Sequence, residues 1–154
     1  MNLIAQINSH EWLFLDKLIE ENDLQLVLFV AEAKTDQDTE GDLKDILEFA
    51  PSTKINPIIS DENCKRYKIT FENYLIYSVA NESFVDWDEN ENFEGNLFRK
   101  YSKSKFLDYI QRAVNVEYAQ ILMDEGEYHH FCICCSNQII DVASPAQPII
   151  EELS

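Results

Sequence analysis

The chain has 154 residues, enough for one domain with a substantial core, and its 45% apolar residues, three glycines and four prolines exclude a disordered or fibrous protein. Its 12 basic and 29 acidic residues give a net charge of −17, which disfavours nucleic acid and anionic membranes and favours positively charged partners. Residues 1–6 lack the basic start of a signal peptide, and the apolar run 26–31 is too short to span a bilayer. We therefore expect a cytoplasmic protein, while noting that acidity also serves solubility.

The N-terminal segment carries apolar residues at helical spacing, which predicts a helix over residues 3–18. Ser9 is suited to restart this helix as an N-cap, and Asn22 to end it. The stripe consists of Leu3, Ile4, Ile7, Phe14, Leu15 and Leu18. Leu24 to Ala33 follows as a predicted strand inside the sheet, because both of its faces are apolar.

Residues 36–42 form an acidic polar loop without a basic residue. A short helix is predicted over Leu43 to Phe49, ending before Pro51 because a residue that precedes proline leaves the helical region. The segment 55–59 contains Pro57 and suits an edge strand or an irregular connection.

The stretch from Tyr67 to Val79 is the most strand-like part of the chain, and we expect it in the middle of the sheet. Tyr67, Ile69 and Phe71 alternate with polar residues, which predicts a half-buried strand. A more continuous apolar run follows over 74–79. The pattern fits either a hairpin that turns at residues 72–73 or a single long, bulged strand.

The second half of the chain continues with a second acidic stretch, 82–94, with the aromatics Phe84 and Trp87 near its start. A strand is predicted over 97–101 and a helix from its N-cap Ser104 to Val114, whereas residues 115–127 fit a helix or a strand. Two strands, 128–135 and 138–143, form a predicted hairpin before the chain leaves through two prolines. The order of elements predicts a single α+β domain, residues 1–154, with a mainly antiparallel sheet and two main helices packed on it.

Metal and calcium sites are each weighed against an ordinary structural role. His130, Cys132 and Cys134 share one face of a predicted strand, but the outer two Cα atoms are about 13 Å apart, and cysteine is commonly a core residue. We read these thiols, with Cys64 and Cys135, as reduced. The segment from Asp86 resembles a calcium loop but has Glu91 where glycine is required and Leu97 where glutamate is required.

Motifs of covalent catalysis are absent from the sequence. It contains no Gly-x-Ser-x-Gly elbow, glycine-rich phosphate loop or His-Glu-x-x-His helix. We therefore expect no catalytic residue, no cofactor and no bound metal, and hence no enzyme. Two basic groups, residues 65–68 and 99–105, fit lysines that blunt the edge of a sheet.

Four segments look like those of small bacterial proteins with no assigned activity: residues 67–74, 77–83, 93–110 and 139–144. In its acidity, small size and lack of a chemical motif, the chain is also similar in character to immunity proteins of bacterial toxin systems, including contact-dependent growth inhibition. That resemblance implies a partner: a toxin domain, often a basic nuclease, whose active site the immunity protein occludes.

An acidic loop with an aromatic anchor suits such a basic groove, since charge raises the association rate and the buried aromatic supplies affinity. The best candidates for contact with the partner are Glu82, Asp86, Trp87, Asp88, Glu89, Glu91 and Glu94. The second set consists of Asp36, Asp38, Glu40 and Asp42. The alternative is a small ligand-binding or enzymatic domain whose pocket the sequence does not reveal. The sequence leaves the oligomeric state open.

Overall fold

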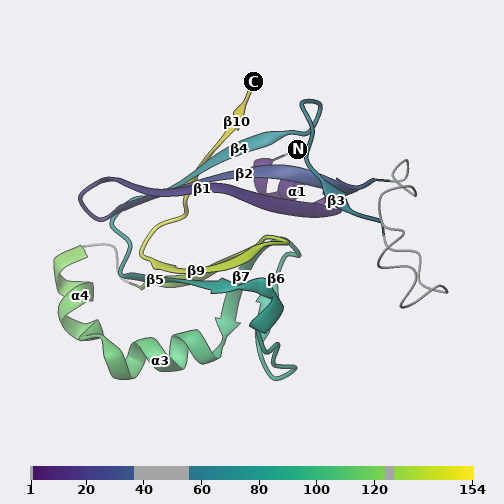
Figure 1. The fold of residues 1–154 in the computed structure, drawn as a ribbon. Coiled ribbons are helices and arrows are strands. Elements are labelled where there is room, and N and C mark those ends of the chain that lie inside the picture. The colour runs from purple at the N-terminus through teal and green to yellow at the C-terminus, as the bar shows by residue number, and fades with distance from the viewer. Residues whose placement is uncertain (1, 37–55, 124–126) are drawn as a thin grey trace.

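The computed structural model describes residues 2–36, 56–123 and 127–154, and in these the chain builds two antiparallel sheets that face each other (Figure 1). The first sheet has the order β1 (Trp12–Asn22), β2 (Gln25–Thr35), β4 (Arg66–Phe71), β10 (Ile149–Leu153), with the short β3 (Ile58–Ile59) paired to the end of β2. The second has the order β5 (Ile76–Asn81), β9 (Gln138–Ser144), β8 (His129–Cys134), β7 (Phe98–Lys103), β6 (Asn92–Glu94).

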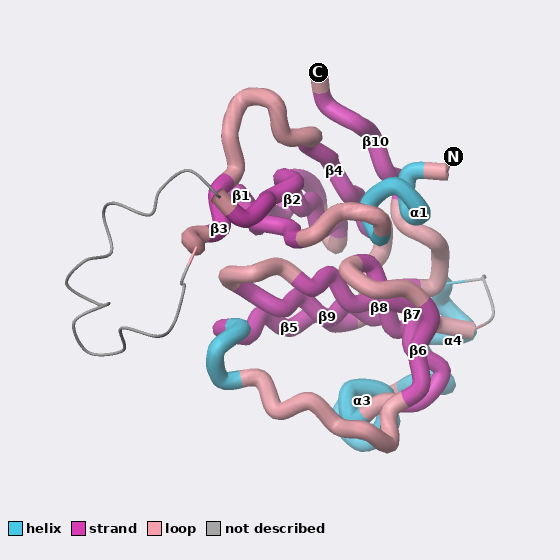
Figure 2. Tube along the Cα trace, turned by 90° about the vertical axis from the view of Figure 1, so that its right-hand side faces the viewer, coloured by secondary structure: helices cyan, strands magenta, loops and turns pink. Residues whose placement is uncertain are grey.

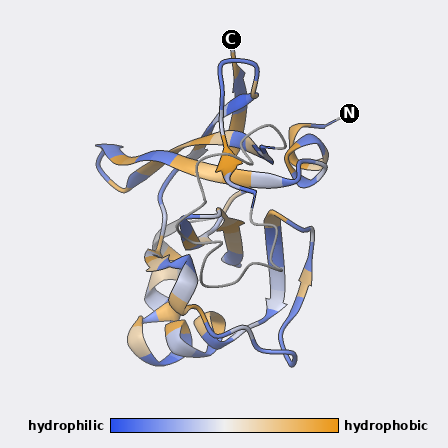
Figure 3. Cartoon of the chain, turned by 45° about the vertical axis from the view of Figure 1, so that its right-hand side comes forward, coloured by the Kyte–Doolittle hydropathy of each residue, from blue (hydrophilic) through white to orange (hydrophobic). Residues whose placement is uncertain are grey.

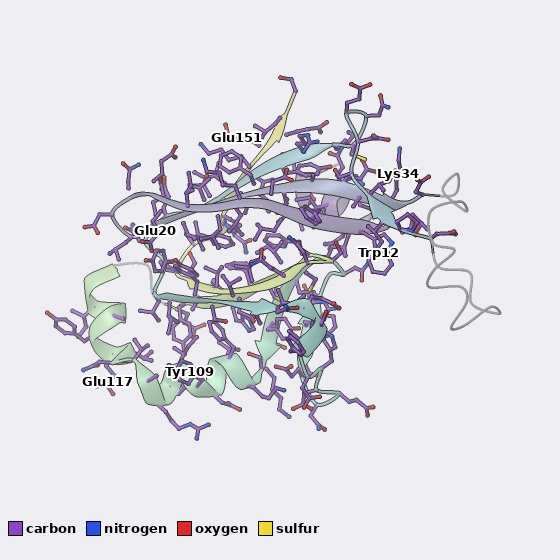
Figure 4. All side chains as sticks on the ribbon, viewed as in Figure 1. Trp12, Glu20, Lys34, Tyr109, Glu117 and Glu151 are labelled. Carbon is purple, nitrogen blue, oxygen red and sulfur yellow. The ribbon has the colours of Figure 1, made fainter. Side chains whose placement is uncertain are left out.

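Helices occupy the outside and one end of this arrangement. The helices α3 (Lys105–Ala113) and α4 (Val116–Met123) lie on the far side of the second sheet from the first (Figure 1). The helix α1 (Leu3–Asn8) lies against β10 and β7, with Ile7 fully buried. Tyr109 of α3 and Glu117 of α4, labelled in Figure 4, are both exposed. Within the described residues, no helix has the length and apolar character needed to cross a membrane.

The core lies between the two sheets. β2 and β4 contribute Leu28, Ile69 and Phe71, and β8 contributes Phe131, whose ring centroid is 5.7 Å from that of Phe71. Figure 3 shows hydrophobic and hydrophilic positions alternating along the strands, as expected where one face of a sheet is buried. Burial of these side chains is the main source of stability, at about 25 cal/mol per Å² of apolar surface.

The predicted antiparallel α+β class is confirmed, but its detail differs. Two sheets stack face to face where one was expected. Of the two predicted main helices, the one from Ser104 is α3, whereas the N-terminal one is reduced to the short α1, and α4 is a third helix among the described residues. The predicted interior strand at 24–33 is β2, which lies between β1 and β4. The segment 55–59 contains β3, and the predicted helix at 43–49 lies outside the described residues.

The prediction of a helix over residues 3–18 is wrong after residue 8. Residues 12–22 form β1, which pairs with β2. The register shifts between Leu15 and Lys17, so that Leu13, Leu15 and Leu18 all face the core although the last two are three residues apart. A bulge changes the phase of strand alternation by one residue, and this produced the apparent helical spacing.

The stretch from 67 to 79 is neither a hairpin nor one strand. β4 and β5 belong to different sheets, and the chain crosses between them over residues 72–75, where Asn73 has a φ of 54°. The N–H of Tyr74 donates to the carbonyl of Leu24 in the turn between β1 and β2, and that of Leu75 donates to the carbonyl of Ala143 in the second sheet. The expected central position therefore holds for β4, whereas β5 is an edge strand.

The C-terminal half agrees better with the prediction. β7, the α3 helix with Ser104 as its N-cap, and the β8–β9 hairpin are confirmed, and residues 116–123 form α4. β10, beyond the two prolines, was missed; it pairs with β4.

One side chain joins α1 to the second sheet. The Oδ1 atom of Asn8 accepts the backbone N–H groups of Asn96, Leu97 and Phe98 at 2.8–2.9 Å. Gly95 precedes them with a φ of +95°, and a Cβ there would lie 2.0 Å from the carbonyl oxygen of Phe98. This turn therefore requires glycine, and it sets the start of β7.

Candidate functional site

The acidic stretch 82–94 lies over the side of the second sheet that carries α3. It begins with the short 3-10 turn η1 (Glu82–Phe84), which the side chain of Asn81 caps by accepting the N–H of Ser83 at 3.0 Å. Phe84 projects from this turn and is 84% exposed, more than any other large apolar residue among those described. An exposed aromatic on a capped turn is a candidate anchor for a partner.

The predicted carboxylates divide into two groups. Glu91 accepts the backbone N–H of Lys105, at the start of α3, at 2.9 Å. Asp88 accepts the backbone N–H of Asn90 at 2.9 Å and its side-chain amide N–H at 3.0 Å. The hydrogen bond from the backbone N–H of Asn90 is the main cause that lowers the pKa of Asp88. These two residues therefore support the local fold rather than present free acceptors.

The remaining carboxylates face solvent. Asp86, Glu89 and Glu94 are exposed and Glu82 is half-buried, with Glu94 opposite Lys100 in the β6–β7 register. Of the predicted contact residues, Glu82, Asp86, Trp87 and Glu89 are available for contact near η1. Together with Phe84, which was not in the predicted set, they form what we call the acidic–aromatic surface.

Trp87 is held in place by Arg99 of β7. The guanidinium carbon lies 4.9 Å from the centroid of Trp87 and 4.2 Å from that of Phe93. Hydrogen bonds from Arg99 to the carbonyl of Asn96 and the hydroxyl of Tyr101 fix the guanidinium. Trp87 remains 46% exposed, so its ring is oriented by cation–π contact and still reaches solvent.

A cavity of about 300 Å³ lies beside this surface. Asp86, Trp87 and Glu91 line it from the acidic stretch, Lys105 from α3, and His130 and Asp141 from the sheet. The Nζ atom of Lys105 donates to the carbonyl of Asp86 at 3.0 Å, which ties the acidic stretch to the helix. The cavity thus combines aromatic walls with groups of both charges.

Three residues form a hydrogen-bonded chain behind the cavity, and the sequence did not indicate it. Nε2 of His130 lies 2.7 Å from Oδ1 of Asp141, and Nδ1 lies 2.8 Å from Oγ of Ser104. Because a carboxylate only accepts, Nε2 carries the proton in the neutral ring and Nδ1 accepts from Ser104. The Ser104 oxygen in turn accepts the N–H of Leu107. Alternation along β8 and β9 was the signal that places His130 and Asp141 on one face.

Serine, histidine and aspartate are the residue types of a nucleophilic triad, but we assign a structural role to the hydrogen-bonded series Ser104, His130 and Asp141. Ser104 and His130 are each only 2% exposed, Ser104 does not line the cavity, and its hydroxyl caps α3. The His130 ring also stacks on Tyr101 at 4.5 Å. A nucleophile must reach its substrate, so we read the chain as a support that joins α3 to the sheet.

The cysteines are buried and reduced, as the sequence indicated. The sulfur atoms of Cys132 and Cys134 lie 3.7 Å apart; this contact raises the pKa of Cys132 and lowers that of Cys134. Both ring nitrogens of His130 are already engaged. Among the described residues, no three His, Cys, Asp or Glu side chains converge to hold a metal ion.

The two basic groups do not lie at sheet edges, which corrects their interpretation. Lys65, Arg66 and Lys68 precede or lie within β4, an internal strand, and they pair with carboxylates of β1 and β10. Arg66, for example, lies 3.0 Å from Asp16. The residues of the second group up to Lys103 belong to β7, which lies between β6 and β8.

The second predicted contact set is only partly described. Asp36 follows β2, and its N–H donates to the carbonyl of Pro57 at 2.8 Å. Asp38, Glu40 and Asp42 lie outside the described residues.

Comparisons with known proteins add no relative: no family model, no curated protein and no solved structure matches this chain.

Proposed function

We propose that this protein is a cytoplasmic immunity protein that binds a cationic bacterial toxin domain, such as a basic nuclease, through the acidic–aromatic surface and occludes its active site. The observation that carries the proposal is Phe84, which projects from a capped turn between the half-buried Glu82 and the exposed Asp86. An aromatic in the centre of an interface loses its contact with water on binding, and charges around it steer the approach of an oppositely charged partner.

The arrangement of the surface supports this role. Trp87 is already oriented by Arg99, so little side-chain entropy is lost when a partner covers it. Asn81 caps the turn that carries Phe84. The net charge of −17 raises the rate of encounter with a cationic protein, and this effect weakens as salt rises.

The test is binding to the C-terminal domain of the toxin encoded next to this protein, measured by calorimetry and by growth of cells that express both. We expect Phe84→Ala to weaken binding by about 30-fold or more, as for an interface hot spot. The triple variant Glu82→Gln, Asp86→Asn, Glu89→Gln should slow association and reduce its salt dependence.

A matched control removes the same charge elsewhere. The triple variant Asp23→Asn, Glu62→Gln, Glu127→Gln changes three other exposed carboxylates, and like the first triple it takes the net charge from −17 to −14 (−17 + 3). If both triple variants behaved alike, charge would act without a defined surface. If no cationic toxin domain bound at all, the proposed function would be wrong.

A second candidate function is the binding of a small organic ligand in the cavity beside Trp87. Its volume of about 300 Å³ is at the lower end for ligand sites, and its aromatic wall and carboxylates suit an amine. Titration with small aromatic amines, followed by Trp87 fluorescence in a Trp12→Phe background, tests it. Saturable quenching that Asp141→Asn weakens would favour this function over the first.

A further inference from the structure

Among the described residues, the strands at the two ends of each sheet order, β1, β10, β5 and β6, differ in how they are protected against pairing with another chain. β1 carries Asp16, Lys17 and two glutamates and has register shifts, and β10 carries Glu151 and Glu152. β6 has only three residues, with a register shift. β5, with the sequence IYSVAN, has no charged residue and pairs with β9 in unbroken register over six residues. Natural edge strands usually carry charges, prolines or bulges, so β5 stands out.

The register shows which backbone groups of β5 point to its open side. The N–H of Cys135 donates to the carbonyl of Gln138, so these two residues form a hydrogen-bonded pair. Because such pairs alternate along an antiparallel ladder, the even-numbered residues of β9 bond to β8 and the odd-numbered residues bond to β5. Their partners on β5 are Ile76, Ser78 and Ala80. The N–H of Glu82, which donates to Asn137, continues this series. The N–H and C=O groups of Tyr77 and Val79 therefore point away from the sheet, and Figure 2 shows β5 at its edge.

The side chains of β5 divide between the two faces of the sheet, with Tyr77 and Val79 on one face and Ile76, Ser78 and Ala80 on the other. Val79, 42% exposed, pairs with the core residue Ile140 and so lies on the side that faces the first sheet. Ser78 pairs with Asp141 and lies on the opposite side, next to the cavity. β5 then runs directly into η1 and Phe84. A strand added here would lie beside Val79 on one face of the sheet, on the face of Asp141 on the other, and next to the acidic–aromatic surface.

Charge decides which occupant suits the edge. Two copies of a chain with a net charge of −17 repel each other, which disfavours pairing of β5 with a second copy. The carboxylates nearest this edge are Glu82, Asp86 and Asp141. A cationic extended segment has the opposite sign and meets these same carboxylates favourably. The occupant is therefore basic rather than a second copy.

We propose that β5 accepts an added strand from the cationic partner, whose basic side chains alternate with apolar ones. The basic residues lie on the side of Asp141, the apolar residues pack beside Val79, and the backbone bonds to Tyr77 and Val79. This inference rests on the proposed function and adds to it the conformation and residue pattern of the segment that binds.

The test uses synthetic peptides of alternating lysine and valine in two N-methylated isomers of equal charge and composition. In one isomer the methyl groups block the N–H groups that would bond to β5; in the other they block the N–H groups on the far side. We expect the second isomer to bind at least 10-fold more tightly and to shift the amide resonances of Tyr77 and Val79. Equal binding of the two isomers would overturn the proposal.

On the protein, Val79→Lys adds a charge at this edge, and Leu153→Lys adds the same charge on β10 as a control. We expect the first to weaken peptide binding at least 10-fold and the second less than 3-fold, with both variants checked for folding by thermal unfolding. If Phe84→Ala weakened binding to the toxin domain while Val79→Lys did not, the proposed function would stand and the β5 inference would fail. A wild-type dimer in sedimentation that Val79→Lys abolished would assign the edge to a second copy and overturn it.

Discussion

The hydroxyl of Ser104 caps α3 through the N–H of Leu107 and also meets Nδ1 of His130 at 2.8 Å. A single oxygen thus joins the helix start to the middle of the second sheet. His130 passes the connection on to Asp141 through its other nitrogen. The wall of the cavity and the acidic stretch that packs on α3 therefore depend on one buried hydrogen-bonded chain.

Replacing Ser104 with alanine should lower the free energy of unfolding by about 2 kcal/mol, because it removes a helix cap and leaves a buried imidazole nitrogen unsatisfied. Urea unfolding measures this loss. Ser104→Thr, which keeps the hydroxyl, should recover most of it. Ser102→Ala, at an exposed position two residues earlier, should change stability by less than about 0.5 kcal/mol. Equal effects of the two alanine variants would contradict the role given to Ser104.

Asn8 accepts three backbone N–H groups, so Asn8→Ala should cost about 3 kcal/mol at roughly 1 kcal/mol for each bond. Asn8→Asp keeps the acceptor, and three donors would hold the pKa of the new carboxyl below its usual ~3.9. Since this folded pKa is depressed, the added stability is present above about pH 4 and is lost as the pH falls through the folded pKa.

Urea midpoints of Asn8→Asp and the wild type from pH 7 to pH 2 measure this dependence. The exposed Asn56→Asp adds the same charge without these donors, and its difference from the wild type should vary little with pH. A parallel pH course for the two aspartate variants would show that Asn8 does not act through these bonds.

Burial raises the pKa of Tyr67 and of Tyr101 to about 12 in each case. Because both folded values lie above the unfolded value of about 10, stability is full below pH 10 and falls as the pH rises from about 10 to 12. We expect Tyr67→Phe and Tyr101→Phe to flatten this alkaline slope of the urea midpoint. The exposed Tyr109→Phe should leave the slope unchanged, and flattening there would contradict the assignment.

Arg99 lies over the rings of Trp87 and Phe93, and Arg99→Met should cost about 1 kcal/mol through the loss of these contacts. It should also raise the quenching of Trp87 fluorescence by acrylamide in a Trp12→Phe background. Lys103→Met, an exposed position on the same strand, serves as the control. Unchanged quenching in Arg99→Met would show that the guanidinium does not orient the indole.

Local chemistry was sufficient for several elements. Strict alternation around Ile69 predicted β4, and Ser104 followed by an apolar stripe predicted α3. The turn at residues 136–137 between two apolar runs predicted the β8–β9 hairpin. Each of these signals lies within a few residues of the element that it specifies, so no distant partner was needed to read it.

Pairing between distant segments decided the rest. The spacing of Leu15 and Leu18 is helical in isolation, and only the pairing of β1 with β2 makes it a bulged strand. The sequence determined that residues 82–94 are acidic. Contact with the start of α3 decided that Glu91 holds the fold, and a local turn engages Asp88 with Asn90, while Glu82, Asp86 and Glu89 remain available. The sequence also determined the composition of β5, whereas the order of strands in the second sheet decided that this uncharged strand lies at an edge. Composition and local spacing belong to the chain itself, but an edge, a cavity and a shared hydrogen bond exist only once distant segments meet.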